Sequence, residues 1–503
     1  MRVLICLAAV CMPAQAQAQV RFEPQAMPFE HVYEGGWEHF VGGGIATFDC
    51  DGDEFPDLYV AGGAGPAQLF RNRSAQGGPL VFEQADAPAI TGATGAYPID
   101  IDSDGHLDLF VLRVGPNRIL RGAGDCRFED GAFGLAHEDR WSTAFSATWE
   151  AGQSLPTLAV GQYVDRADPE GPFEACDSNT LHRPTGTDYR RVTLTPGYCA
   201  LSMLFSDPDR RGKAALRVSN DRHYYVRDGS EQMWDLSNPP RLRTAEEGWE
   251  ELSIWGMGIA SRDLTGDGRP EIMLTSMGDQ ILQFAEPEGG YSNAAFQVGT
   301  YAQRPYLGDD GRPSTGWHAQ FADVNNDTRP DLFIAKGNVD QMPSNAIKDP
   351  NNLLVQQADG TFEEHGDTAG VASTARARGA SLADLNGDGL LDLVVINRRA
   401  PMEVSRNVTP VPGNWIALDP LQKGPNPNAL GAWIEVQTPA GLQTLEVTLG
   451  GGHASGAQVP HHFGLGKAPY ATVRITWPDQ TQTPWRTVKA NTLHRIVKPA
   501  SLP

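Results

Sequence analysis

The residues best suited to chemistry in this chain carry oxygen atoms and recur in five short segments with one common spacing. Positions 1, 3, 5 and 9 of the segments are occupied by Asp49, Asp51, Asp53 and Asp57; Asp100, Asp102, Asp104 and Asp108; Asp263, Thr265, Asp267 and Glu271; Asp323, Asn325, Asp327 and Asp331; and Asp384, Asn386, Asp388 and Asp392. With a backbone carbonyl at position 7, these side chains form an all-oxygen cage, which suits a hard cation that takes about six to eight ligands. The spacing predicts several structural calcium ions.

These loops are not EF-hands. An EF-hand needs a bidentate Glu at position 12, and position 12 is apolar here: Val60, Val111, Leu274, Ile334 and Val395. Each loop instead leads directly into a short apolar strand, which favours a structural role over calcium sensing. The alternative is a set of solvated Asp-rich turns, although five copies in register favour metal cages.

Position 6 of each loop should adopt a positive φ, which glycine allows at no steric cost. Gly is present there in three of the five loops, whereas Glu54 and Thr328 stand at the same position in the first and fourth loops. We expect these two loops to be strained or to bind calcium more weakly.

The charge of the chain is concentrated in the loops. The 503 residues include 62 acids and 40 Lys and Arg, which gives a formal net charge of −22. Seventeen acids occupy the ligand positions, and the other 45 nearly balance the basic residues. The acidity argues against nucleic acid or an anionic lipid surface as partner, because no surplus of basic residues exists to neutralise phosphates.

The spacing of the loops indicates a repeat. Successive loops start 51, 163, 60 and 61 residues apart, so two decayed copies should lie in the long gap. One is visible from Asp207 to Gly212, where Arg211 stands at position 5, and a weaker one lies near Asp165 and Asp168. We expect Arg211 to pair with Asp207 and Asp209 in place of a metal. Seven units of four short strands predict an all-β fold, a seven-bladed β-propeller.

The N-terminus should close the ring. Phe22-Glu23 matches the outermost strand of other units, so it should complete the last blade. The propeller is predicted for residues 19–412 and a small β-rich, sandwich-like domain for 413–499, with the Pro/Gly/Asn-rich segment from Thr409 to Asn414 as linker. A linear solenoid is the structural alternative, but terminal caps are not evident.

Residues 1–18 read as a signal peptide. One Arg precedes an apolar stretch and small residues suitable for cleavage, and no later run is long enough to span a membrane. The chain is therefore expected to be secreted or periplasmic. Cleavage leaves Cys50, Cys126, Cys176 and Cys199, which allow three disulfide connectivities. We favour Cys176–Cys199 with Cys50–Cys126, because closing the short loop costs least entropy; free buried thiols are the alternative.

The loops resemble the FG-GAP/VCBS repeats of integrin-α-like propellers, and the tail resembles an ASPIC/UnbV domain. The tail motifs are Asn428-Ala-Leu-Gly431-Ala432, Gly450-Gly-Gly452-His453-Ala-Ser455, His462-Phe463-Gly464-Leu465-Gly466 and Val473-Arg-Ile-Thr-Trp477-Pro478. The combination is similar to the secreted cartilage acidic protein family and its bacterial relatives. This resemblance implies a calcium-binding propeller for extracellular interaction, and it brings no established catalytic residues.

Two function classes follow. The leading hypothesis is a calcium-stabilised binding or adhesion module for an extracellular protein or glycan. The alternative is a propeller enzyme, a hydrolase or lyase on a glycan-type substrate, with its active site in the central channel.

Two further groups of residues could bind ligands. His453, His461 and His462 could form a transition-metal site, but no Cys or carboxylate accompanies them at ligand spacing, so packing is favoured. Trp141, Trp149, Trp234, Trp249, Trp255 and Trp317 could line a glycan-binding rim, although packing between blades is the commoner role of such residues.

Overall fold

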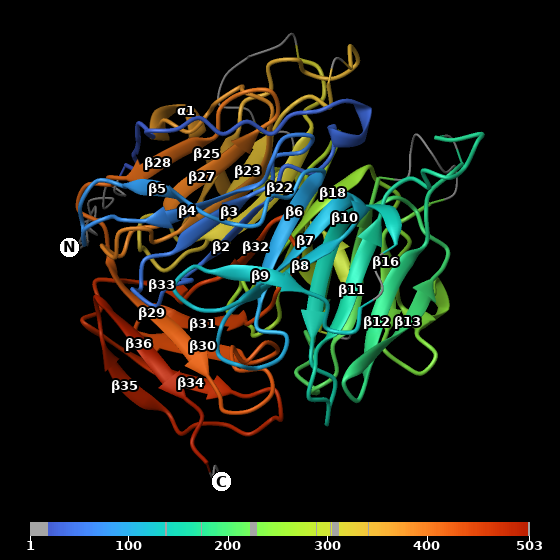
Figure 1. The fold of residues 1–503 in the computed structure, drawn as a ribbon. Coiled ribbons are helices and arrows are strands. Elements are labelled where there is room, and N and C mark those ends of the chain that lie inside the picture. Colours follow the sequence, from blue (N-terminus) through green and yellow to red (C-terminus); the bar gives the residue numbers. More distant parts are fainter. Residues whose placement is uncertain are drawn as a thin grey trace, which may run out of the picture.

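The computed structural model describes residues 19–135, 138–172, 174–221, 229–287, 289–301, 303, 311–340 and 342–500, so the predicted signal peptide lies outside the described residues. Strands dominate (Figure 1), and the described helices are single turns: η1 (Trp37–His39), η2 (Ala245–Glu247), η3 (Phe296–Val298) and α1 (Gly366–Ala369). None of the described helices has the length and apolar character needed to span a bilayer. The prediction of an all-β fold is confirmed.

Antiparallel pairing gathers the described strands β1 to β28 into seven four-stranded sheets, two of them joined through β7 and β10. From inner to outer strand the sheets are β2 (Ile45–Phe48), β3 (Asp57–Val60), β4 (Gln68–Asn72), β5 (Phe82–Ala85); β6 (Ala93–Ile99), β7 (Asp108–Pro116), β8 (Arg118–Gly122), β9 (Phe128–Gly131); β10 (Asp139–Thr148), β11 (Thr157–Gln162), β12 (Asn179–Thr185), β13 (Asp188–Leu194); β14 (Ala200–Ser206), β15 (Ala215–Asn220), β16 (Gln232–Asp235), β17 (Arg241–Leu242); β18 (Gly256–Arg262), β19 (Glu271–Ser276), β20 (Ile281–Ala285), β21 (Tyr291–Asn293); β22 (Gly316–Ala322), β23 (Asp331–Lys336), β24 (Asn352–Gln356), β25 (Phe362–Glu364); and β26 (Ala377–Ala383), β27 (Asp392–Asn397), β28 (Glu403–Asn407), β1 (Phe22–Pro24).

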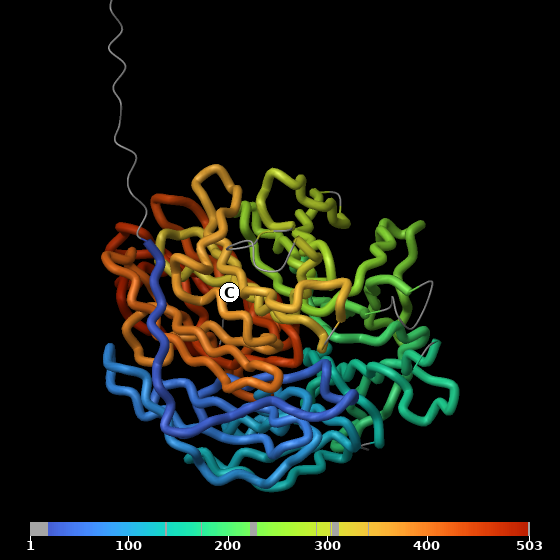
Figure 2. Tube along the Cα trace, turned by 90° about the horizontal axis from the view of Figure 1, so that it is seen from above, coloured from blue at the N-terminus to red at the C-terminus, as the bar shows by residue number. Residues whose placement is uncertain are grey.

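The sheets form a closed ring. Each inner strand contacts the inner strand of the next sheet, and β26 contacts β2. Figure 2 shows the chain passing around the ring from blue to orange. Strand β1 pairs with β28, Phe22 opposite Asn407, so the prediction that the N-terminus completes the last sheet is confirmed. This closure excludes the solenoid alternative.

One of the two decayed repeats was misplaced. Asp165 and Asp168 lie after β11, at the opposite end of the strand from the acidic loops. The segment equivalent to a loop is 149–156, between β10 and β11, where the Glu150 carboxylate binds Arg183 at 2.9 Å. The error arose because Glu150 stands outside the position-1-3-5 pattern used to find the repeats.

Two disulfides join the described cysteines. Cys50 is linked to Cys126, which ties the first loop to the turn between β8 and β9, and Cys176 is linked to Cys199. The favoured connectivity is confirmed.

The last strands form two further sheets packed against one face of the ring (Figure 1). One has the order β33 (His461–Gly466), β29 (Asn414–Leu421), β36 (Thr492–Val497), and the other has β31 (Gly441–Glu446), β30 (Trp433–Thr438), β34 (Tyr470–Thr476), β35 (Arg486–Lys489). A single hydrophobic core includes Tyr97 and Phe145 of the ring together with Ile434 and Trp477 of these sheets. The ring and the C-terminal sheets therefore bury apolar surface against each other.

A segment of the C-terminal region enters the centre of the ring. Leu449 bridges to β10, Gly452 to β18 and Ser455 to β6, and β32 (Gly456–Gln458) pairs in parallel with β2. The backbone N–H of Gly451 donates to the Met203 carbonyl on β14 at 2.7 Å, and that of His453 donates to His318 Nδ1 on β22 at 3.1 Å. We call residues 449–458 the axial segment.

Glycines on the inner strands make room for the axial segment. A Cβ atom at Gly44 would lie 1.7 Å from the Ala454 carbonyl oxygen, and one at Gly95 would lie 2.1 Å from the same atom. Only a residue without a side chain fits at such distances. The channel in the centre of the ring is thus filled by the chain itself.

Candidate metal centres

The five acidic loops occupy equivalent places in the ring. Each connects an inner strand to the second strand of its sheet, and the acid at position 9 begins that second strand: Asp57, Asp108, Glu271, Asp331 and Asp392. Four loops contact the C-terminal sheets directly. Asp263 accepts a hydrogen bond from Thr444 at 2.7 Å, Asn326 bonds His462 at 2.6 Å, Arg495 pairs with Glu54 at 3.0 Å, and Gly389 lies against Trp415. The loops therefore lie at the junction of the two parts of the molecule.

The carboxylate at position 1 folds each loop. In the fifth loop, Asp384 accepts the N–H groups of Asp388 at 3.1 Å and Gly389 at 2.8 Å. Equivalent bonds reach positions 5 and 6 from Asp100 and Asp323, and positions 4 and 6 from Asp49 and Asp263. The turn is thus held by its own aspartate.

The acid at position 9 connects the loop to the third strand. Asp392 accepts the N–H of Leu385 at position 2 at 3.0 Å and that of Asn407 on β28 at 2.8 Å. Asp57, Asp108 and Asp331 repeat both bonds, and Glu271 accepts the position-2 N–H of Leu264. These side chains have a structural role whether or not they also bind a cation.

Burial makes the negative charges of the loops costly. It raises the pKa of Asp57 to about 7, of Asp108 to about 8, of Glu271 to about 7 and of Asp100 and Asp384 to about 6, and neighbouring carboxylates raise these pKa values further. Burial first, and the charges of neighbouring aspartates second, also raise the pKa of Asp323 to about 7. A bound divalent cation would offset this cost, because it supplies the opposite charge at the same place.

The ligand oxygens gather most closely in the first two loops. Asp49, Asp51 and Asp53, and separately Asp100, Asp102 and Asp108, each offer carboxylate oxygens within 4.8 Å of one another. One oxygen of Asp51 is buried with no hydrogen-bond partner. An all-oxygen donor set with an unsatisfied buried oxygen fits calcium. In the other three loops Thr265, Asn325 and Asn386 stand at position 3, and no such carboxylate group forms among the described residues.

Arginines approach the same oxygens. Arg71 binds Asp51 at 2.5 Å, Arg121 binds Asp102 at 2.8 Å, and Arg406 binds Asp388 at 3.1 Å. All three arginines extend from third strands of the sheets. A cation and a guanidinium would therefore share these carboxylates.

The backbone at position 6 has positive φ in all five loops. Gly105, Gly268 and Gly389 have φ of 90°, 87° and 83°, and Glu54 and Thr328 have φ of 74° and 83°. The predicted strain at Glu54 and Thr328 is confirmed, and it is greatest for the β-branched threonine.

The decayed loop differs partly from expectation. Arg211 lies 3.5 Å from Asp209, but the Asp207 carboxylate accepts the N–H groups of Gly212 at 2.5 Å and Lys213 at 3.2 Å. Arg210 instead reaches Glu435 of the C-terminal sheets at 3.3 Å. Only one of the two predicted pairings of Arg211 is formed, because Asp207 keeps the turn-forming role of position 1.

The three histidines are packed separately. His453 lies fully buried in the axial segment, where its Nε2 accepts the Gly42 N–H at 3.1 Å and its ring contacts Trp317 at 4.9 Å. His462 stacks on Trp415. The described residues bring no cysteine or carboxylate group around them that could hold a metal with them.

The tryptophans that were candidates for a glycan rim are mostly packed inside. Trp141, Trp234 and Trp317 are buried. The exposed tryptophan near them is Trp37, which packs edge-on against Trp141 at 4.9 Å.

Sequence reasoning missed the axial segment. Glycines in the inner strands and the run Gly450-Gly-Gly452 were the available signals. Such glycines indicate that another stretch of backbone passes close to the strand. The predicted location of the alternative active site, the central channel, is filled by residues 449–458.

Comparisons with known proteins agree with this architecture. A family model described as an FG-GAP-like repeat matches residues 49–111 and 323–395, and one described as ASPIC and UnbV matches residues 422–503. Cartilage acidic protein 1 of Mus musculus is 22% identical over 468 residues, which cover 87% of this chain and 70% of the mouse protein. The Homo sapiens protein is 22% identical over 473 residues, covering 87% and 68%.

Among solved structures, BBS1N, crystallised in complex with ARL6DN, aligns with a TM-score of 0.46 at 12% identity, covering 78% of this chain and 99% of that chain. Virginiamycin B lyase from Staphylococcus aureus aligns with a TM-score of 0.41 at 9% identity, covering 72% and 94%. From its loops, its ring and its tail, the chain is a protein of FG-GAP-like repeats with a C-terminal ASPIC and UnbV domain, similar to cartilage acidic protein 1.

Proposed function

We propose that this chain is exported and acts as a calcium-stabilised binding or adhesion module for an extracellular or periplasmic protein or glycan. The observation that carries the proposal is the axial segment. It crosses the centre of the ring, and we place the partner on the outer surfaces of the ring. Two disulfides fit an oxidising compartment, and the similarity to cartilage acidic protein 1 supports a location outside the cytoplasm.

Calcium would hold the ring and the C-terminal domain together at the acidic loops. Asp49, Asp51 and Asp53 would hold one ion, and Asp100, Asp102 and Asp108 another. The ion would neutralise buried carboxylates that already fix the turn and the third strand. The remaining loops have fewer carboxylates and are expected to bind more weakly.

The face opposite the C-terminal domain is the proposed partner surface. Trp37 is half exposed on it and rests against Trp141, with Phe40 and Tyr163 beneath. A rigidly supported aromatic side chain is a common anchor in protein and glycan recognition.

The proposal is tested in two steps. Equilibrium dialysis should show calcium bound at the acidic loops, with the Asp51→Ala variant losing about one ion per chain. A glycan array and a capture screen of extracellular proteins, run with calcium, should give a partner whose binding falls at least about tenfold in Trp37→Ala. Trp485→Ala is the matched control, because Trp485 is exposed on the C-terminal domain. If no calcium is bound, the proposed calcium sites are wrong. If both tryptophan variants lose partner binding equally, the proposed partner surface is wrong.

A further inference from the structure

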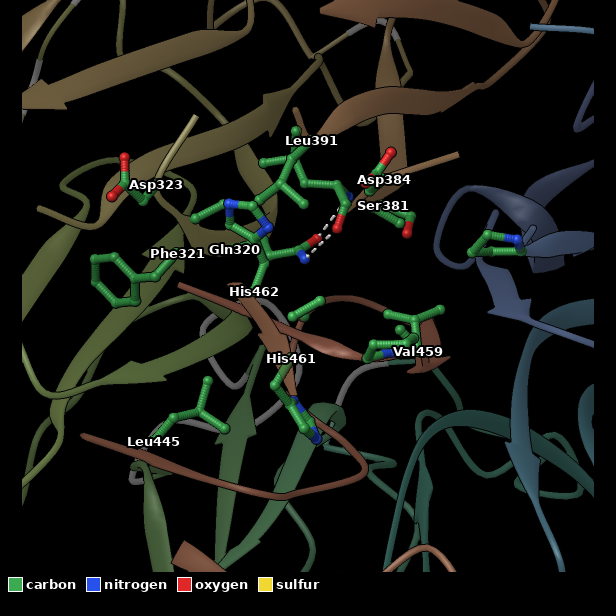
Figure 3. A pocket seen from close by; sticks show the side chains of 18 of the residues that line it. Gln320, Phe321, Asp323, Ser381, Asp384, Leu391, Leu445, Val459, His461 and His462 are labelled. Atoms are coloured by element: carbon green, nitrogen blue, oxygen red, sulfur yellow. Dashed lines mark hydrogen bonds between the residues drawn. The ribbon is translucent and has the colours of Figure 1, made fainter. Parts of the chain in front are cut away.

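A chamber lies between the ring and the C-terminal domain, where inner strands of the ring meet the axial segment. Its volume is about 650 Å³, and its walls come from β18, β22 and β26 of the ring and from the C-terminal segments 445–462 and 491–493. Figure 3 shows Gln320 and Asp323 of the ring and His461 and His462 of the C-terminal domain among the side chains that line it. Exposed Glu54, Gln76 and Asn491 border the chamber and connect it with solvent.

The carboxylates on the chamber wall are already engaged. Asp323 accepts two backbone N–H groups of its loop, and so does Asp384. Glu446 accepts the Asp207 N–H at 2.7 Å and a short hydrogen bond from the Ser206 hydroxyl at 2.5 Å. The amide of Gln320 is bonded in both directions to Leu382. The acceptors of the wall therefore have partners within the protein.

The arginine on the wall has no hydrogen-bond partner among the described residues. Arg262 is 7% exposed, its Nε is buried without a hydrogen bond, and its guanidinium forms no ion pair or hydrogen bond with the described residues. Its contact is the face of Phe463, 4.9 Å from the ring centre. The charges of Asp263 and Asp323 act on Arg262, but both carboxylates accept hydrogen bonds from their own loops. An anion in the chamber would therefore supply the hydrogen bonds that the guanidinium lacks.

Histidines also line the chamber. The Nδ1 of His318 accepts the His453 N–H at 3.1 Å, so its proton resides on Nε2, an atom that is buried away from the chamber space. His461 lies near enough to Arg262 that, after burial, the arginine charge lowers the pKa of the imidazole. The positive charge of Arg262 thus acts on this part of the wall.

The rest of the wall is apolar. Leu204, Ile259, Phe321, Leu391 and Leu445 line it, three of them visible in Figure 3. An inorganic anion would leave this surface in contact with water, whereas an organic anion would cover it.

We propose that the chamber binds a small organic carboxylate. The carboxylate pairs with the guanidinium of Arg262, and the apolar body lies against Phe321, Leu391 and Leu445. Arginine suits this role because its planar fork matches a carboxylate with two parallel hydrogen bonds.

Isothermal titration of the full chain, at saturating calcium, with benzoate, benzamide and inorganic phosphate as probes tests the proposal. Benzoate should bind, benzamide at least about tenfold more weakly, and Arg262→Met should lose at least about tenfold in benzoate affinity. Arg217→Met is the matched control, since Arg217 is equally buried and lies over Trp249 and Tyr291 away from the chamber; it should leave benzoate binding unchanged.

A second variant keeps the test valid if Arg262→Met does not fold. Leu445→Trp leaves Arg262 in place but fills the chamber, and it should abolish benzoate binding while the thermal transition persists. Equal binding of benzoate and benzamide, binding of phosphate alone, binding that survives Arg262→Met or Leu445→Trp, or no binding of benzoate would overturn the proposal. The calcium content of each variant, measured in parallel, separates this result from the function proposed above.

Discussion

The intact acidic loops and the decayed loop of the fourth sheet are held in place by different hydrogen bonds. In an intact loop the acid at position 9 accepts the position-2 N–H, as Asp392 does from Leu385. In the decayed loop position 9 is Ala215 and position 2 is Pro208, which has no N–H. The position-2 donor and its acceptor have been lost together, so this hydrogen bond leaves no unpaired partner behind.

The C-terminal domain supplies what the decayed loop lacks. Glu446 on β31 accepts the Asp207 N–H and the Ser206 hydroxyl, and Arg210 reaches Glu435 on β30. The difference teaches that a loop in this ring can be held either by a dense set of its own carboxylates or by side chains from the neighbouring domain. In our proposal the first solution needs a cation and the second does not.

Calcium removal should destabilise the protein more than any of the substitutions described below. Each occupied site stabilises the fold by about 2.7 kcal/mol when free calcium exceeds Kd about a hundredfold. Chelation should therefore lower the melting temperature by about 3 °C for each occupied site, or about 5 °C for the two loops with the closest carboxylates. Scanning calorimetry with EDTA and then with excess calcium measures the loss and its recovery. An unchanged transition in EDTA would show that the intact loops need no cation.

Asp392→Ala should be the most damaging single substitution of the set. It removes the acceptor of two buried N–H groups, at a cost of about 3 kcal/mol in the free energy of unfolding. Asp209→Ala, in the decayed loop, should change it by less than about 0.5 kcal/mol, because Asp209 is half exposed. Urea denaturation measures both, and equal losses would erase the distinction between the loops.

Glu446→Gln should stabilise the decayed loop in a pH-dependent way. Burial raises the pKa of Glu446 to about 7, above its usual value of 4.5. The folded wild type therefore keeps its proton while the unfolded chain ionises, so the stability from the neutral carboxyl is full below pH 4.5 and is lost as the pH rises to 7.

Because the glutamine amide stays neutral and can bond both partners, its advantage should grow from near zero at about pH 4.5 to about 1–2 kcal/mol at about pH 8. Denaturation curves at both pH values check this. An advantage that does not change with pH would mean that Glu446 is ionised in the folded state.

Thr328→Gly should have the smallest effect. Glycine relieves the cost of a β-branched residue at φ of 83° and loses more backbone entropy on folding, so a net gain of about 0.5–1 kcal/mol is expected. Gly105→Thr, the reverse change at the equivalent position of the second loop, should destabilise the protein, because φ is 90° there and a Cβ atom would meet nothing within 4 Å. Thermal melts of the two variants should move in opposite directions, and shifts of the same sign would contradict the strain argument.

Much of this architecture was visible in the sequence because the loops repeat. Register between copies predicted the all-β ring, its closure by Phe22-Glu23 and the strain at Thr328. Contacts between repeats and tail were not predictable, since the alternation of Leu445 or Trp433 shows that a strand is half buried but not what covers it. The chamber was missed for the same reason: Arg262, His318 and His461 come together only when both parts have folded.

The axial segment has a consequence for how the polypeptide reaches its final state. Residues 449–458 are made after every strand of the ring, and they occupy the space toward which Gly44 and Gly95 point. We expect a ring without this tail to have a hollow centre walled by glycines. Truncation before residue 449 should yield a loosened, protease-sensitive ring. The stable fold should therefore form only after the last tenth of the polypeptide has been synthesised.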